Sequence, residues 1–459
     1  MPEAIVTQIL HFYLLPLIAA LTLAAGGKAK SMYRIGGPLM GIQSIFLLWQ
    51  ASTAGDMAKM SLILLFVASA VIAASLVHAE LTGIMTRPRE FHALAILLYF
   101  PLLAAYLSNN LGYLWFAIET ATLVSAGLVY MHRDKRALEA TWKYFIICSV
   151  GVALALLGTI SIFASTQAGG EVGTMSFSAL KSSILASDPD LAALGFVMCL
   201  VGYGTKCGIF PLHGWMPDAY SESEAPAAAI LSGAFSPAIF FALYRVAEVF
   251  AAGPRWALYS QILMWIGVAT SLLASIFLVR QYGLKRLWAY SSIENTGLVM
   301  VAISLQIPSL FVLQCLNHSL NKVAVFLLSG NVIDIIGSKK LSRIHGLLAD
   351  DRARPTGILL AAGALAVLGA PPFGSFASEW MIFARLAKSG EYAVLTLSLL
   401  SLVIAFIAIA THVSSMLFGY LKHSEHRSPR RVSVAVPVCL LLLSLLLGLS
   451  YCFPEALKL

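Results

Sequence analysis

Residues 202–233, GYGTKCGIFPLHGWMPDAYSESEAPAAAILSG, interrupt a chain that is otherwise hydrophobic. The stretch holds a lysine, a histidine, an aspartate and two glutamates among several prolines and glycines. Proline and glycine both weaken a helix, and an uninterrupted membrane helix has little use for such a mixture. The pattern predicts instead a membrane helix that is broken around an ionisable group, with Pro211 at the break and Lys206 close to it.

The composition of the whole chain is that of a membrane protein. Of its 459 residues 59% are hydrophobic and 11% are charged, whereas soluble domains carry about a quarter charged residues. We therefore expect one all-α membrane domain over residues 1–459, embedded in a lipid bilayer. The net charge of +8 follows the connections between apolar segments, so no nucleic-acid partner is expected. The N-terminal segment lacks a basic region and is interpreted as a retained first span.

The hydrophobic pattern predicts about 14 transmembrane helices, since about 20 apolar residues cross a bilayer. Their expected bounds are 5–25, 36–53, 60–79, 91–107, 110–131, 143–166, 191–210, 222–250, 256–280, 288–306, 308–335, 355–385, 391–420 and 432–453. Basic residues gather after the odd-numbered spans, from Lys28 to Arg34 and again from Lys422 to Arg431. The positive-inside rule then puts the odd connections in the cytoplasm and both termini on the outer face.

A second break is predicted in span 12, where Pro371 and Pro372 precede Glu379. Four spans separate the two breaks, which indicates two units of five helices, 91–250 and 256–420, flanked by residues 1–90 and 432–453. Because five is odd, the second unit is expected to be inverted. Inverted repeats with discontinuous helices are typical of ion-coupled transporters.

Ionisable residues inside the spans are the candidate site, because a charge at the bilayer centre costs from about 3 to over 10 kcal/mol. Glu119 lies in the middle of span 5, where a functional role competes with a structural hydrogen bond. Burial and a nearby carboxylate act in opposite directions on a lysine's proton affinity. A Glu119–Lys206 pair could therefore exchange a proton as the pair forms or separates. The alternative is a static salt bridge between two helices.

His318 and Lys322 lie four residues apart, on one face of a predicted helix. Imidazole titrates near neutrality and suits proton relay, although a single buried histidine is often only a packed core residue. No third and fourth ligand is evident, so no metal site is expected. Glu379 is predicted to be a terminal carboxylate that faces one aqueous side. Glu294 is either part of the relay or an interfacial charge.

The other polar candidates are weaker. His213, Asp218 and Glu222 shape or line the first break, where capping and turn closure compete with proton transfer. His412 in span 13 has an ambiguous depth. The six cysteines are scattered singly, and the sequence holds no CxxC pair and no nucleotide-binding glycine pattern. We therefore expect no cofactor in this chain.

Five blocks of sequence carry a family resemblance. They are WFAIETATL with LEATWKYFIICSVGVAL, GYGTKCGIFPLHGWMPDAYSE, KRLWAYSSIENTGL, LNHSLNKVAVFLLSGNV and GAPPFGSFASEW. Over about residues 90–385 they resemble the Mrp-antiporter-like subunits of respiratory complex I. Within that family SSIENTG, KYFIIC and LNHSLNK are most similar to the hydrogenase-4 component F type, whose complexes are membrane-bound NiFe hydrogenases and formate hydrogenlyases.

The resemblance implies inverted five-helix units around a polar axis at mid-membrane. It assigns proton or ion translocation to a set of axis residues, namely Glu119, Lys206, Lys143, His318, Lys322 and Glu379. It also implies other membrane subunits as partners and, through them, a peripheral redox arm of hydrogenase or dehydrogenase type. The ion is H⁺ or Na⁺, and the location is a prokaryotic cytoplasmic (inner) membrane.

The chain departs from this family near its centre. Many relatives carry a lysine or histidine in span 8 as the bridge between half-channels, and the corresponding residue here is Pro237. Tyr220 stands where relatives tend to have a histidine, and Glu224 is an additional carboxylate. Three functions therefore stay open: an ion-translocating subunit of a redox complex, a structural anchor whose axis no longer conducts, and a stand-alone cation/proton antiporter.

Overall fold

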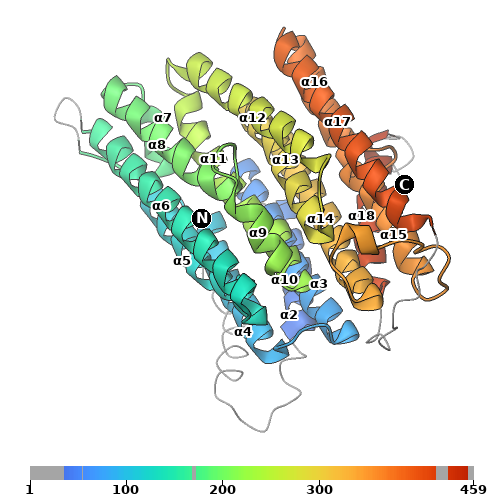
Figure 1. Cartoon of the computed structure of the whole chain (residues 1–459). Coiled ribbons are helices and arrows are strands. Elements are labelled where there is room, and N and C mark those ends of the chain that lie inside the picture. Colours follow the sequence, from blue (N-terminus) through green and yellow to red (C-terminus); the bar gives the residue numbers. More distant parts are fainter. Residues whose placement is uncertain (1–35, 54, 168–171, 420–432, 453–459) are drawn as a thin grey trace.

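The computed structural model describes residues 36–53, 55–167, 172–419 and 433–452, which are almost entirely helical (Figure 1). Within this part nine helices are long and apolar enough to cross a membrane, and Arg354–Val367 and Ala435–Tyr451 are shorter apolar helices. The predicted first span, 5–25, and the basic runs from Lys28 to Arg34 and from Lys422 to Arg431 lie outside the described residues. The helical membrane fold is confirmed, whereas the count of 14 is not.

The first described helices follow the predicted spans closely. They are α2 (Gly36–Thr53), α3 (Asp56–Thr82), α4 (Pro88–Leu107), α5 (Leu111–Val129) and α6 (Lys135–Ser165). Helix α6 begins at Lys135 rather than at 143, because the Asp134 carboxylate accepts a hydrogen bond from the backbone N–H of Ala137 and caps the helix there. Asn110 caps α5 in the same way. A short helix, α7 (Phe177–Ser183), precedes α8 (Pro189–Cys207).

The predicted first break is present over residues 208–214, between α8 and α9 (Trp215–Glu222). Gly208 ends α8 with a φ of 78°, a conformation that glycine adopts without strain. Side chains of neighbouring helices form hydrogen bonds with the backbone groups that the break leaves free. Thr296 donates to the Cys207 carbonyl over 3.3 Å, and the N–H of Phe210 donates to Thr270 over 3.1 Å. Non-helical backbone at membrane depth requires such protein partners.

The predicted second break is also present, over residues 368–373, between α15 (Arg354–Val367) and α16 (Gly374–Lys388). Asn321 of α14 (Pro308–Ile336) donates to the Ala366 carbonyl over 2.9 Å, and the Ser375 hydroxyl donates to the same oxygen. Both breaks are thus held by side chains of continuous helices.

The predicted span 8 is divided into three pieces. Helix α10 (Ala225–Ile230) continues through a π-helical turn, Leu231–Phe235, into α11 (Ser236–Ala251). The apolar part of this span lies entirely inside the protein. The remaining helices are α12 (Trp256–Leu278), α13 (Leu284–Ser304), α17 (Tyr392–Leu417) and α18 (Ala435–Cys452).

The packing places α10 and α11 between two groups of helices. In Figure 1 the α5–α6 pair lies on one side and α16–α17 on the other, with α9 to α11 and α13 to α14 between them. Helices α8 and α9 pack on α6, and α15 and α16 pack on α14. This correspondence agrees with two five-helix units, whose division stays a prediction.

Candidate functional site

Lys206 lies in the last turn of α8, immediately before the first break. Its side chain is fully buried, and its Nζ atom has no hydrogen-bond partner among the residues that the structure describes. The ammonium group lies 5.2 Å from the ring centroid of Tyr144 and 4.9 Å from that of Phe235. Aromatic faces attract a cation without accepting its protons in the way that a carboxylate does. Lys206 is therefore held in place while its N–H groups stay available.

Glu119 on α5 faces the same region and is half-buried. Its Oε2 atom is buried and has no hydrogen-bond partner within the described part of the chain. Glu119 and Lys206 lie within electrostatic reach of one another, but these two residues form no ion pair. The static salt bridge that the sequence left open is therefore not present in this structure. The two groups are arranged as separated partners.

The structure corrects the position of Lys143. Its side chain is 45% exposed and lies 2.6 Å from the Glu139 carboxylate and 3.2 Å from the Asp218 carboxylate. The same face of α6 exposes Trp142 and Ile146. Lys143 therefore lies on the outer surface of this chain rather than on a buried axis with Lys206.

His318 and Lys322 are buried together on α14, as their spacing predicts. Lys322 donates to the Ser291 hydroxyl over 2.5 Å, and His318 Nδ1 lies 3.0 Å from the Asn295 amide oxygen. Both partners belong to α13. The His318 ring also packs edge-on against Phe240 of α11.

Two carboxylates complete the surroundings of Lys322. Glu294 and Glu379 are each 4% exposed, and both lie within electrostatic reach of Lys322 without an ion pair among these three residues. Ser271 donates to Glu294 over 3.3 Å. Glu294 is therefore an interior group, which rules out the interfacial alternative. The expectation that Glu379 faces water is wrong in this structure, because α16 carries it into the protein.

Asparagines on α14 contribute to this region and were not predicted. Asn317 donates to Ser378 and Asn321 to Ser375, each over 3.2 Å, so both reach α16 across the second break. The signal was available, because 317 and 321 repeat the four-residue spacing of 318 and 322. One edge of α14 thus binds α13, and the adjacent edge binds α16.

The carboxylates at the first break form surface ion pairs rather than an axis. Asp218 pairs with Arg286 and Lys143, and the Glu222 carboxylate lies 2.7 Å from Lys339. These contacts tie α9 to α6, α13 and the segment after α14. The capping role that the sequence also allowed is not observed for α9, because Gly214, the residue before this helix, makes no side-chain cap.

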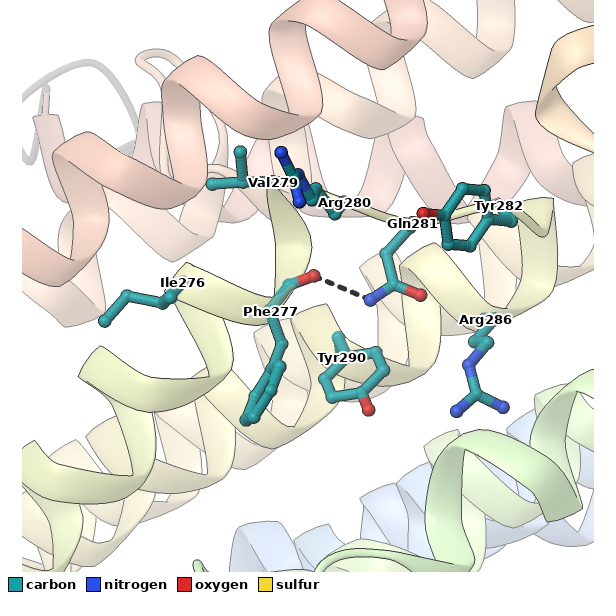
Figure 2. Close-up of a pocket in the computed structure, with 8 residues that line it drawn as sticks. All are labelled: Ile276, Phe277, Val279, Arg280, Gln281, Tyr282, Arg286 and Tyr290. Atoms are coloured by element: carbon teal, nitrogen blue, oxygen red, sulfur yellow. Dashed lines mark hydrogen bonds between the residues drawn. The ribbon is translucent and has the colours of Figure 1, made fainter.

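The two remaining histidine candidates have packing contacts. His213 stacks on Phe210 at a centroid distance of 5.4 Å, and His412 Nε2 lies 3.2 Å from the Leu278 carbonyl. Beside His213 a surface pocket of about 680 Å³ is lined by Phe277, Tyr290 and Arg286 among others (Figure 2). Neither Lys206 nor Lys322 lines this pocket.

A separate polar cluster surrounds Glu224. Its carboxylate accepts hydrogen bonds from the backbone and hydroxyl of Thr86 and lies 3.5 Å from His132. Lys285 donates to the neighbouring Ser223 carbonyl. A cavity of about 420 Å³ opens here. Within the described part of the chain, no three His, Cys, Asp or Glu side chains are grouped so that they could hold a metal ion.

Comparison with known proteins gives a family match over residues 108–405. The matched family is described as NADH:quinone oxidoreductase/Mrp antiporter, transmembrane. A hydrogenase-4 component F homolog of Methylacidiphilum infernorum is 36% identical over 299 residues, which are 64% of this chain and 62% of the relative, less than two thirds of its length. NADH-quinone oxidoreductase subunit N of Desulforudis audaxviator is 30% identical over 384 residues, 79% of this chain and 74% of that one.

Solved structures with the same fold come from respiratory membrane complexes. A chain of the archaeal membrane-bound sulfane sulfur reductase superposes with a TM-score of 0.83 at 23% identity, covering 97% of this chain and 94% of its own. A chain of respiratory complex I from Thermus thermophilus gives 0.79 at 22% identity, with coverages of 96% and 97%. At these identities the likeness concerns the fold.

Proposed function

Because this chain belongs to the NADH:quinone oxidoreductase/Mrp antiporter transmembrane family, we propose that it moves protons across the membrane within a redox-driven complex. It is an antiporter-like membrane subunit, and its relatives include subunits of hydrogenase-4 and of NADH-quinone oxidoreductase. We assign its complex to the hydrogenase-4 or complex I type. The electron-transfer chemistry would then lie in a peripheral arm of partner chains.

The observation that carries the proposal is the buried ammonium group of Lys206, which has Glu119 within electrostatic reach and no hydrogen-bond partner in the part of the chain that the structure describes. A buried charge without a close partner is unstable relative to its neutral form, whereas an approaching carboxylate stabilises it. Movement of α5 relative to α8 would therefore load Lys206 with a proton when Glu119 approaches. It would release the proton when Glu119 withdraws.

The second step takes place around Lys322. This ammonium group shares its surroundings with Glu294, Glu379 and the imidazole of His318. A proton that reaches His318 or Lys322 can pass to a carboxylate, since both kinds of group exchange protons by hydrogen bonding. In this scheme Glu379 is the last acceptor beside the second break. Release on the far side then requires opening of α16.

The proposal extends to the partners, the location and the orientation of the chain. The partners are other membrane subunits of the complex, and the location is a prokaryotic cytoplasmic membrane with both termini on the outer face. We propose that the chain itself holds no cofactor and that its role is ion movement.

The test is a Lys206→Met variant in membrane vesicles that hold the complete complex. Redox-driven acidification and electron transfer are measured side by side, with Lys388→Met as a control because Lys388 is exposed. We expect Lys206→Met to remove proton movement while the complex stays assembled. Unchanged proton movement per electron in an assembled complex would instead support the structural anchor.

The stand-alone antiporter is addressed by a second experiment. The chain is purified without partners and placed in liposomes with an imposed pH gradient. Robust Na⁺/H⁺ exchange in that preparation would contradict the need for a redox complex.

A further inference from the structure

Buried hydroxyl groups occupy the space between the Lys206 region and the His318–Lys322 region. Tyr220 of α9 and Ser236 of α11 join their hydroxyls over 2.9 Å. Ser232 in the π turn joins its hydroxyl to that of Ser292 on α13 over 3.2 Å. Tyr220 also lies close to Ser232. These four side chains, the hydroxyl chain, are between 0 and 4% exposed.

Pro237 has a direct effect on this arrangement. A π turn pairs each carbonyl with the N–H five residues further on. The N–H of Ser236 bonds the Leu231 carbonyl in this way, and the next pair would join the Ser232 carbonyl to residue 237. Proline has no N–H to donate. The Ser232 carbonyl is therefore left without its backbone partner in that register.

His318 lies where it can serve that carbonyl. Its ring is in contact range of the Ser232 backbone, and its buried Nε2 atom has no hydrogen-bond partner among the described residues. Edge-on packing against Phe240 fixes the ring at this point of the span. Pro237 thus leaves the Ser232 carbonyl free to accept a hydrogen bond from the histidine of the neighbouring helix.

The hydroxyl chain reaches both lysine sites. At one end, Tyr220 packs edge-on against Trp215, which packs in turn on Tyr144, one of the rings that the Lys206 ammonium group faces. The side chain of Lys206 is flexible, so rotation about its bonds can bring an N–H donor to the hydroxyl chain. At the other end, the backbone of Ser232 lies within contact range of His318, which is four residues from Lys322 on α14.

The π turn beside the hydroxyl chain packs closely against α14. A side-chain carbon added at Gly233 would overlap Val323 of α14. The hydroxyls bond to one another and to helix carbonyls, as Ser236 does to Leu231 and Ser292 to Trp288. A permeating cation needs a ring of oxygens that replaces its hydration shell. A proton needs only a continuous series of hydrogen bonds.

We propose that the hydroxyl chain of Tyr220, Ser236, Ser232 and Ser292 carries the ion between the two lysine sites, and that this ion is H⁺ rather than Na⁺. The inference rests on the proposed function. Each hydroxyl accepts a proton on its oxygen and gives up the one it held, so one N–H bond breaks at Lys206 and one forms at His318 or Lys322. Only O–H and N–H bonds change, and no oxidant or reductant takes part.

The experiment uses the complete complex in membrane vesicles, with redox-driven acidification measured per electron transferred. The variants Tyr220→Phe and Ser292→Ala remove one hydroxyl each, and Ser292→Thr restores it. Matched controls are Tyr106→Phe and Ser329→Ala. Among the described residues the buried Tyr106 hydroxyl has no hydrogen-bond partner, and the Ser329 hydroxyl bonds the Val325 carbonyl of its own helix. Each variant is also assayed with choline in place of Na⁺ and in D₂O.

We expect Tyr220→Phe and Ser292→Ala to lower proton movement at least about tenfold, in line with the usual contribution of a placed proton-transfer group. Ser292→Thr and both controls should keep it, the wild type should respond to D₂O, and choline should change nothing. Full activity of both hydroxyl-removing variants while Lys206→Met abolishes transport would overturn the inference and leave the proposed function standing. A requirement for Na⁺ would also overturn it. Full activity of Lys206→Met itself would contradict the proposed function instead.

Discussion

Lys206 and Lys322 are both buried lysines, yet their surroundings differ in kind. Lys206 lies against aromatic rings and has no hydrogen-bond partner among the described residues, while the nearby carboxylate of Glu119 forms no ion pair with it. Lys322 donates to Ser291 and lies among Glu294, Glu379 and His318. The first site is built to gain and lose a partner, and the second holds several exchangeable protons at once. We therefore assign proton uptake and release to Lys206 and proton storage to the site around Lys322.

The largest expected effect is a difference in stability between variants at Lys322 and at Lys206. Lys322→Met would leave Glu294 and Glu379 buried beside one another without a nearby cation, and breaking a buried charge arrangement costs about 3 kcal/mol. Lys206→Met removes an ammonium group that has no hydrogen-bond partner in the described structure, so stability should rise by about 1 kcal/mol. Thermal unfolding of the detergent-purified complex measures both. Equal destabilisation by the two variants would contradict the comparison.

A second prediction concerns the turn that holds Glu379. Gly369 has a φ of 63°, and a side-chain carbon added there would overlap the Glu379 carboxylate. Gly390 has a φ of 78° with open space around it. Alanine at either position suffers the backbone penalty of about 1–2 kcal/mol for left-handed residues. Only Gly369→Ala should also displace the carboxylate.

We therefore expect Gly369→Ala to lower proton movement about tenfold beyond any effect of Gly390→Ala. Acidification by vesicles with matched amounts of assembled complex is the measurement. If the two variants lose the same activity, the position of the Glu379 carboxylate is not what matters at the second break.

Local signals in the sequence account for what was predicted correctly. Proline and glycine disrupt helices wherever they occur, so both breaks could be placed within a few residues. The four-residue spacing of His318 and Lys322 fixes their common face. Burial of Lys206 followed from its position in an apolar span. Each of these inferences needs only the residues of one helix.

What the sequence could not provide is the rotation of each helix about its axis. Membrane helices that are apolar on all sides carry little amphipathic signal, so the inward face is not marked. The family resemblance placed Lys143 on the axis although its face of α6 is outward, and Glu379 was expected at water although α16 turns inward. The contacts of Asn317 and Asn321 depend on how α16 returns after the second break.

A third prediction concerns Pro237, which lies between the Lys206 and Lys322 sites. Pro237→Ala restores a backbone N–H that can bond the Ser232 carbonyl, which would remove the need for His318 there. We expect stability to rise by about 1 kcal/mol, because an interior proline is replaced, and proton movement to fall several-fold. Unfolding and acidification are measured on the same preparation. A rise in both quantities would show that Pro237 impedes transfer rather than supporting it.

The smallest expected effect lies at the surface network of Lys143, Asp218 and Arg286. Exposed ion pairs contribute about 0–1 kcal/mol, and added salt screens them further. Lys143→Met should therefore change stability by less than about 1 kcal/mol and leave proton movement within about twofold, unlike Lys206→Met. The measurement is acidification by vesicles at low and high salt. A loss as deep as that of Lys206→Met would return Lys143 to the axis that the family resemblance implies, and would mean that the outward face of α6 takes part in transfer within the assembled complex.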